Sequence, residues 1–229
     1  MPQDPVILLT RPQSASDRFA SALRAHWSGH IEISPIMAIE PVPVTDVPKA
    51  PGGVILTSGH AVPAAATLAP GATAYCVGGT TAGRASRAGL DAISAGGDAE
   101  ALVAMILADP PRGALLHLRG AEARGDVAAR LTDAGVPCAD RVVYRAVPCN
   151  LSARAQALLD GDAPVILPLF SPRSAELVSG QGPWRAELRI AAMSAAVARA
   201  ATPLCAARLD IAAQPEAEAM LTLTLRLLA

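Results

Sequence analysis

Short apolar runs alternate along this chain with longer stretches rich in alanine, leucine and arginine. The short runs have the length of buried strands, and the longer stretches have the apolar spacing of amphipathic helices. Continuous apolar strands that alternate with helices are typical of an α/β fold, in which helices cover both faces of a parallel sheet. The expected strands are residues 6–10, 31–34, 53–57, 72–77, 114–118, 142–147, 165–169, 188–191 and 204–206. The expected helices include residues 14–26, 99–108, 122–134 and 215–228.

The two halves of the chain resemble each other. Each half contains a strand–helix segment, a proline-bounded extended segment and a strand that ends in serine. The corresponding residues are Arg11 and Arg119, Leu23 and Leu131, Pro41 and Pro148, and Ser58 and Ser171. Such a repeat indicates two related modules. Because each extended link interrupts the order, we expect the chain to leave one domain half built, form the second domain and then return. Two links that pair as strands avoid two exposed edges.

The stretch CVGGTTAGRASRAGL, residues 76–90, predicts a strand, a glycine turn and a helix start, where free backbone N–H groups can bind an anion. It does not match a nucleotide-binding loop, because no lysine follows and Thr80 takes the middle glycine position of the dinucleotide motif. Asp98 and Glu100 are interpreted as the cap and first-turn carboxylate of the next helix. We expect a threonine, Thr80 or Thr81, to cap the helix here; a plain strand-to-helix turn is the alternative.

Composition and charge narrow the function classes. The chain has 229 residues, enough for one large or two small domains, with 52% hydrophobic residues, 17% charged residues and a net charge of −1. It lacks the excess of Lys and Arg typical of nucleic-acid binding. The N-terminal segment has no basic region before its short apolar run, and no apolar run has the length of a membrane span, so we expect neither a signal peptide nor a membrane anchor.

The cysteines and histidines are dispersed, with no CxxC pair and no clustered histidines. This pattern argues against a metal site and a disulfide framework, and is typical of a cytoplasmic protein. These residues are Cys76, Cys138, Cys149, Cys205, His26, His30, His60 and His117.

Seven short motifs, in order over essentially the whole chain, resemble those of uroporphyrinogen-III synthases. They are LLTRP, ILTSGHAV, VGGTTA, LRG with a helix ending in DAGV, VVYRAVP, LFSPRSAEL and IAAMSAAVA. No single motif is specific, but their order and spacing together are. The chain departs from the family pattern at His60, where asparagine is usual, before Ser171, where Pro168-Leu169 replaces a common threonine, and at residues 191–194, where AAMS replaces glycine with threonines.

The resemblance implies two flavodoxin-like α/β domains joined by a two-stranded link, with an active cleft between them and no cofactor. The first domain would comprise residues 1–36 and 149–229, the second residues 43–141, and the links residues 37–42 and 142–148. The implied reaction is that of a lyase: hydroxymethylbilane, a linear tetrapyrrole with acetate and propionate groups, loses water, inverts its terminal pyrrole and closes to uroporphyrinogen III. We expect a monomer.

With this substrate, the expected anion is a carboxylate. Tyr144 is the expected catalytic group, because its phenol on a link can bind the departing hydroxyl; the alternative is a tyrosine that only covers the link. The expected substrate-binding residues are Arg11, Ser58, His60, Thr80, Thr81, Arg119, Ser171 and Ser194. As alternatives, Ser58 and Ser171 are ordinary turn residues, Thr80, Thr81 and Ser194 are caps without a ligand, and Arg11 and Arg119 pair with Asp17 and Asp126.

Two other functions remain open from the sequence. A non-catalytic two-domain protein that binds a small anionic ligand fits the duplicated halves and paired links equally well, although Tyr144 favours the enzyme. A nucleotide-dependent oxidoreductase is disfavoured by the broken glycine motif.

Overall fold

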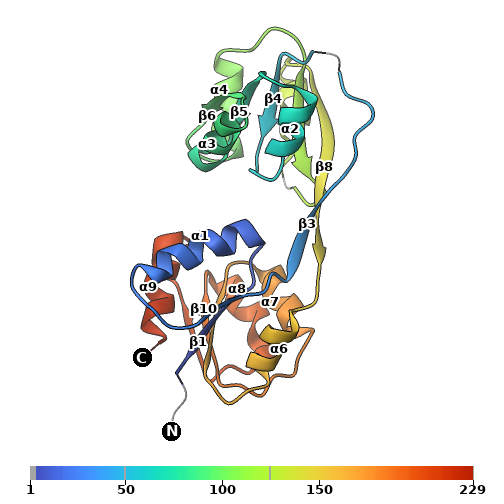
Figure 1. Cartoon of the computed structure of the whole chain (residues 1–229). Coiled ribbons are helices and arrows are strands. Elements are labelled where there is room, and N and C mark those ends of the chain that lie inside the picture. Colours follow the sequence, from blue (N-terminus) through green and yellow to red (C-terminus); the bar gives the residue numbers. More distant parts are fainter. Residues whose placement is uncertain (1–3, 49, 124, 229) are drawn as a thin grey trace. The chain divides into compact units, whose positions relative to one another are not determined.

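The computed structural model describes residues 4–48, 50–123 and 125–228. The chain forms two units: unit 1 comprises Met1–Ala38 and Val147–Ala229, and unit 2 comprises Ile39–Ala146. Each unit contains one sheet with helices on both faces (Figure 1). The expected α/β class with two parallel sheets is confirmed.

The sheet of unit 1 has the strand order β11-β10-β9-β1-β2, and all four neighbouring pairs are parallel. Its strands are β1 (Val6–Leu9), β2 (Ile31–Ile33), β9 (Val165–Leu169), β10 (Leu188–Ala192) and β11 (Arg208–Ile211). Numbered within the unit, this order is 2-1-3-4-5, the order of flavodoxin-like folds.

The helices of unit 1 form two layers because successive strand side chains point to opposite faces. Ile7 and Leu9 pack with α1 (Gln13–Arg24) and α9 (Ala217–Arg226). Leu8 packs on the other face. The helices of that other layer are α6 (Ala153–Leu159), α7 (Pro172–Ser179) and α8 (Ala195–Ala200).

The sheet of unit 2 has the order β3-β8-β7-β4-β5-β6. Its strands are β3 (Met37–Pro41), β4 (Gly53–Leu56), β5 (Thr73–Cys76), β6 (Asp91–Ser94), β7 (Leu115–Gly120) and β8 (Cys138–Pro148). The strands from β4 to β8 are parallel and follow the order 3-2-1-4-5, a doubly wound order that differs from that of unit 1. The link strands β3 and β8 are neighbours, as expected of paired links.

The helices of unit 2 also cover both faces of the sheet. The face with Val54 and Leu56 is covered by α2 (Val62–Leu68) and α3 (Gly79–Arg87). The opposite face, which includes Ile55, is covered by α4 (Ala99–Ala108) and α5 (Val127–Asp133).

Local signals located most elements but misplaced a few. The strand expected at 204–206 is wrong: a 3₁₀ helix, η1 (Thr202–Leu204), ends in Cys205 with a left-handed φ of 49°, and the strand follows as β11. Strand β6 was missed, because its sequence DAIS is only half apolar and three of its four residues are exposed. Asp98 caps α4 as expected, through a 3.0 Å hydrogen bond from the Ala101 N–H.

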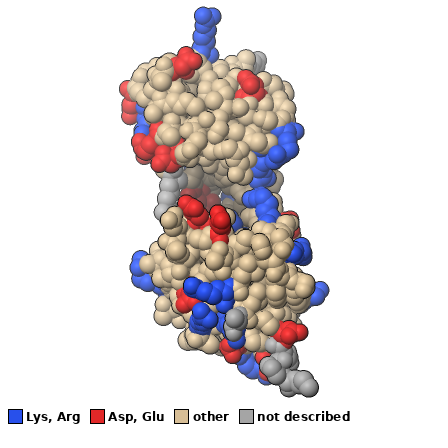
Figure 2. All heavy atoms as spheres, turned by 90° about the vertical axis from the view of Figure 1, so that its left-hand side faces the viewer, with Lys and Arg blue, Asp and Glu red and all other residues tan. Residues whose placement is uncertain are grey.

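Charged side chains are sparse on the surface, as the composition requires. On the face shown in Figure 2, Lys and Arg lie in small separate groups among Asp, Glu and large uncharged areas. No helix in the described part of the chain reaches the length and apolarity of a membrane span.

Candidate active site

In both units the strand order reverses direction at a switch point, where open α/β sheets bind ligands beyond the carboxyl ends of the strands. In unit 1 the chain turns outward in opposite directions after β1 and β9, which are adjacent. In unit 2 it does so after β4 and β7. The segments that follow these four strands are therefore the candidate ligand-binding segments.

At the switch point of unit 1, Arg11 follows β1 and stacks on Phe170, which follows β9. The guanidinium carbon lies 4.0 Å from the ring centroid, and Phe19 packs edge-on against the same ring at 5.1 Å. Burial lowers the pKa of Arg11, and the nearby charge of Arg18 adds to this effect. A partly buried cation is stabilised by an anionic partner, so this site favours binding an anion.

The alternative expectation, a pairing of Arg11 with Asp17, is wrong. The Asp17 carboxylate accepts a 2.9 Å hydrogen bond from the Gln13 amide instead, and Arg11 has no ion pair within the residues described. Helix α1 begins at Gln13, two residues after Arg11, with no acidic residue in its first turn and no side-chain cap. The local potential at this edge is therefore positive.

Two of the predicted serines act as helix caps in unit 1. The Ser194 hydroxyl accepts a hydrogen bond from the Val197 N–H at 3.4 Å and caps α8, as expected. Ser171 caps α7 through the Ser174 N–H at 3.1 Å, and so is more than a turn residue. Each hydroxyl satisfies one N–H group that would otherwise lack a partner.

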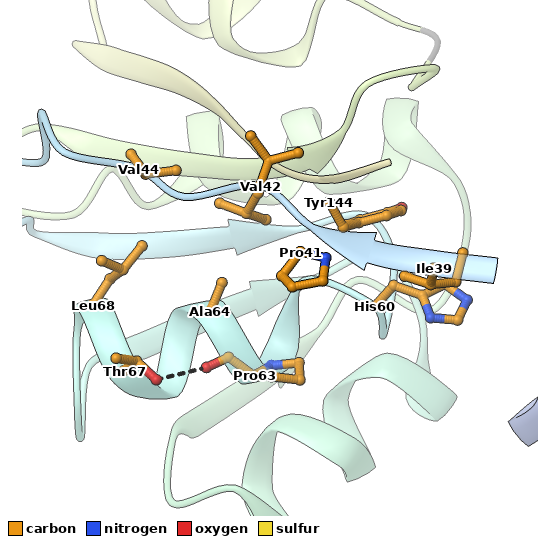
Figure 3. A pocket seen from close by; sticks show the side chains of 11 residues that line it. Ile39, Pro41, Val42, Val44, His60, Pro63, Ala64, Thr67, Leu68 and Tyr144 are labelled. Carbon is orange, nitrogen blue, oxygen red and sulfur yellow. Dashed lines mark hydrogen bonds between the residues drawn. The ribbon is translucent and has the colours of Figure 1, made fainter. Parts of the chain in front are cut away.

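At the switch point of unit 2, the turn after β4 brings His60 to Tyr144. The Ser58 hydroxyl accepts the His60 N–H at 3.3 Å, which closes the turn. The imidazole and phenol ring centroids lie 5.5 Å apart with planes at 56°. The two rings lie at the same end of a cavity of about 480 Å³ (Figure 3). The rest of its lining is mainly apolar and includes Ile39, Pro41, Val42, Val44, Pro63, Ala64, Thr67, Leu68 and Val143.

Gly120, the last residue of the LRG motif, makes room for Tyr144. The two residues are paired between β7 and β8, at an irregularity in the register, and the Tyr144 carbonyl accepts the Ala121 N–H at 2.9 Å. A Cβ at Gly120 would lie 2.6–2.8 Å from three atoms of the phenol. The glycine of the LRG motif therefore leaves the space that the Tyr144 ring occupies.

This contact predicts that Gly120→Ala displaces the Tyr144 ring. Because the added carbon overlaps the ring, we expect unfolding to become easier by about 1–3 kcal/mol, the usual cost of overpacking. Chemical denaturation measures this change. Gly78→Ala is the matched control, because nothing lies within 4 Å of its Cβ position and its φ is extended. A Gly120→Ala protein as stable as the control would contradict the contact.

The start of α3 differs from the expectation. Its N-cap is Gly78, in extended conformation and without a side-chain cap, so the predicted threonine cap is wrong. Because the helix begins at Gly79, Thr80 and Thr81 already lie in its first turn. Thr80 is exposed, whereas Thr81 is buried. The first N–H groups of α3 therefore remain without a side-chain partner, as anion binding requires.

Arg84 was missed from the sequence. It lies on α3, and its guanidinium covers Gly59, where a Cβ would lie 2.8 Å from Nη1. Arg84 has no ion pair in the described parts of the chain. It therefore places a positive charge beside the turn that carries Ser58 and His60. An arginine on a helix usually lies on a solvent-exposed face, so the sequence carried no clear indication that Arg84 belongs to the site.

Arg119 is bound within unit 2. Its Nε donates to both carboxylate oxygens of Asp140 at 2.8 Å, so the alternative pairing with Asp126 is wrong. Asp140 lies on β8 in register with His117 on β7, the strand that also carries Arg119. The partner was set by strand pairing, which the sequence did not reveal. Among the described residues, no group of three or more His, Cys, Asp or Glu side chains is arranged to hold a metal ion.

The comparisons with known proteins bear on this arrangement. The sequence profile described as uroporphyrinogen-III synthase HemD matches residues 17–222. The chain belongs to the uroporphyrinogen-III synthase family. This membership confirms the resemblance read from the seven motifs.

The fold recurs in a solved structure of this family. The uroporphyrinogen-III synthetase of Helicobacter pylori 26695 is 17% identical and matches with a TM-score of 0.68 over 98% of this chain and all of its own. A mutant uroporphyrinogen III synthase of the extremely thermophilic bacterium Thermus thermophilus is 16% identical, with a TM-score of 0.48 over 99% of each chain. Among curated protein sequences, none matches this chain.

Proposed function

We propose that this protein is a uroporphyrinogen-III synthase that cyclises hydroxymethylbilane to uroporphyrinogen III, with loss of water and inversion of the terminal pyrrole. Family membership supports the proposal. The observation that carries it within the structure is the placement of the Tyr144 phenol beside His60, at the end of a largely apolar cavity. In this proposal the enzyme is a cytoplasmic, monomeric hydro-lyase that needs no cofactor.

The reaction demands orientation more than strong acid–base chemistry. The hydroxymethyl C–O bond breaks, the oxygen leaves as water after taking a proton, and an azafulvene cation remains. The substituted carbon of the terminal pyrrole attacks this cation and forms a spiro intermediate. The original bond from this carbon to the neighbouring methylene bridge then breaks and leaves a cation on that bridge. The free α carbon of the inverted ring bonds to this cation, and loss of its proton completes the macrocycle. A hundredfold preference over the uninverted isomer corresponds to about 2.7 kcal/mol, which held geometry can supply.

We assign to Tyr144 the role of hydrogen-bond donor to the departing hydroxyl. A phenol carries one O–H donor, and a positioned hydrogen-bond donor assists the loss of the hydroxyl. The neighbouring His60 ring is the competing donor. The apolar lining of the cavity suits the pyrrole rings, because burial of apolar surface is favourable.

The acetate and propionate groups require positive and N–H-rich surroundings. Arg11 and Arg84, neither of which has a carboxylate partner among the described residues, are proposed to bind them, together with the uncapped first turn of α3. An anion at a helix N-terminus is stabilised by about 0.3–1 kcal/mol when exposed and about 2 when partly buried. The other proposed substrate-binding residues are Ser58, His60, Thr80, Thr81, Arg119, Ser171 and Ser194.

One experiment tests the proposal. The protein is added to freshly generated hydroxymethylbilane, and the isomers are oxidised to porphyrins and resolved. We expect isomer III to dominate, with the same rate after treatment with a chelator. A product mixture no richer in isomer III than the spontaneous background would overturn the enzyme assignment. Tight binding of uroporphyrin without any change in the isomers would instead favour the binding-protein alternative.

A further inference from the structure

A buried histidine in unit 2 has no role in the chemistry proposed above. His117 lies on β7, and only 2% of it is exposed. Its Nδ1 lies 3.4 Å from the Asp140 carboxylate, and its Nε2 lies 3.4 Å from the Thr57 hydroxyl. Asp140 is in turn held by Arg119. A continuous series of contacts thus connects side chains from β8, from β7 and from the residue that follows β4. In order, they are Arg119, Asp140, His117 and Thr57.

The surroundings of His117 define its protonation state. Burial is the main effect and lowers its pKa, Asp140 opposes this effect, and Arg119 adds to it. Cys138, opposite Leu115 in the β7–β8 pair and close to His117, is a neutral thiol because burial raises its pKa to about 11. Asp126, at the start of α5, lines a small cavity together with His117 and Asp140. The imidazole is therefore neutral near pH 7, and the carboxylate beside Nδ1 keeps the proton on that nitrogen.

In this tautomer Nε2 carries a lone pair and accepts a hydrogen bond from the Thr57 hydroxyl. Thr57 is the first residue after β4. Its side chain lies with His117 on the sheet face covered by α4 and α5, the face to which Ile55 also points. The following turn crosses to the α2 face, where His60 meets Tyr144. Thr57 thus anchors one end of the turn that carries Ser58 and His60.

We propose that His117 is a positioning residue, which holds the Ser58–His60 turn against Tyr144 by accepting a hydrogen bond from the Thr57 hydroxyl. This inference rests on the proposed function, because its role is to place residues of that site. Asp140 and Arg119 serve the same end by orienting the imidazole. Besides the substrate contact proposed for it above, Arg119 then acts on the site through His117.

Protonation of His117 reverses the bond to Thr57. A charged imidazole donates from both nitrogens, so the Thr57 hydroxyl becomes the acceptor and must direct its own proton to another partner. Because the pKa of His117 is lower in the folded protein, the stabilisation is complete above the unfolded value of about 6.5 and is lost as the pH falls through the folded value. The free energy of unfolding should decline over the same acidic range.

A pair of isosteric variants separates positioning from packing. The His117→Gln side chain reaches the position of Nε2, and its amide oxygen can accept the Thr57 hydroxyl. The His117→Asn side chain reaches only the position of Nδ1. We expect His117→Gln to keep turnover near that of the parent at pH 7.5, and its free energy of unfolding should lack the parent's decline in acid. His117→Asn should lower kcat about three- to tenfold, the usual value of one hydrogen bond, and should change KM little.

Thr57 completes the test. Thr57→Val removes the hydroxyl at constant shape and should lower kcat as much as His117→Asn, whereas Thr57→Ser should restore it. The double variant His117→Asn with Thr57→Val should be no slower than either single variant. Equal losses in the Gln and Asn variants, additive losses in the double variant, or full activity of Thr57→Val would each overturn the proposal.

A measurement on the unmodified protein covers variants that fail to fold. Nitrogen NMR of the labelled His117 ring at pH 7.5 should show a proton on Nδ1 and none on Nε2. The opposite tautomer, or a charged ring, would overturn the proposal. This readout does not depend on activity: a parent protein that fails to enrich isomer III refutes the proposed function alone, while the ring spectrum still decides the His117–Thr57 bond.

Discussion

Tyr144→Phe is expected to lower turnover of hydroxymethylbilane about a hundredfold while the protein stays folded. The phenol is proposed to donate one hydrogen bond to the leaving hydroxyl, and positioned donors contribute between about a hundredfold and ten-thousandfold. The low end applies because this substrate ionises readily. The phenylalanine ring keeps the contacts with Gly120 and His60, so packing at this end of the cavity is preserved.

The measurement is the single-turnover rate together with the isomer ratio. The share of the spontaneous isomer should rise as the enzymatic rate falls, and the affinity for uroporphyrin should remain near that of the parent. His60→Ala is the control for the competing donor. If Tyr144→Phe retained more than half of the turnover while His60→Ala abolished it, the donor would be His60, and Tyr144 would be a packing residue.

Arg11→Gln is expected to weaken binding of the tetrapyrrole about ten- to a hundredfold. Hydrogen bonds to charged groups contribute about 1.5–3 kcal/mol, and Arg11 is a half-buried guanidinium without a carboxylate partner in the described residues. Loss of its stacking on Phe170 should lower the free energy of unfolding by only about 0.5–1 kcal/mol. The large effect on affinity and the small effect on stability together identify a binding residue.

Arg24→Gln is the matched control, because it removes the same charge at the other end of α1. Affinity for uroporphyrin is measured by fluorescence titration at low and at high salt. The difference between the two variants should persist at high salt, because screening acts mainly on exposed charges, whereas Arg11 is partly buried. Equal affinities of the Arg11→Gln and Arg24→Gln proteins would contradict a specific anion site at Arg11.

Signals that depend on neighbouring residues were read correctly from the sequence. The buried runs that form β1, β4 and β9 are continuous and apolar, and each is a strand. Asp98 before α4 and Ser194 before α8 both cap their helices. These caps and this periodicity act within one or two turns of chain, so local order along the sequence was enough to predict these elements.

Edges and helix starts were harder to predict. Strand β6 has the sequence DAIS, which mixes polar and apolar residues and leaves three of the four exposed, so its hydrophobic pattern does not predict a strand. It forms because β5 offers an edge for pairing. The cap of α3 falls on Gly78 because the backbone leaves β5 in an extended conformation, so that both expected threonines already lie inside the helix. These details depend on where the preceding strand ends, and single-residue preferences do not determine that point.

The sequence by itself determined the alternation of strands and helices, the repeated halves, the train of motifs and the residue types available at the carboxyl ends of the strands. Only the tertiary structure decided which of those residues meet. Arg119 binds Asp140 and not Asp126, and Arg11 stacks on Phe170 and not beside Asp17. These partners come from neighbouring strands far apart in sequence. Strand order and register bring them together, and no local preference encodes either property.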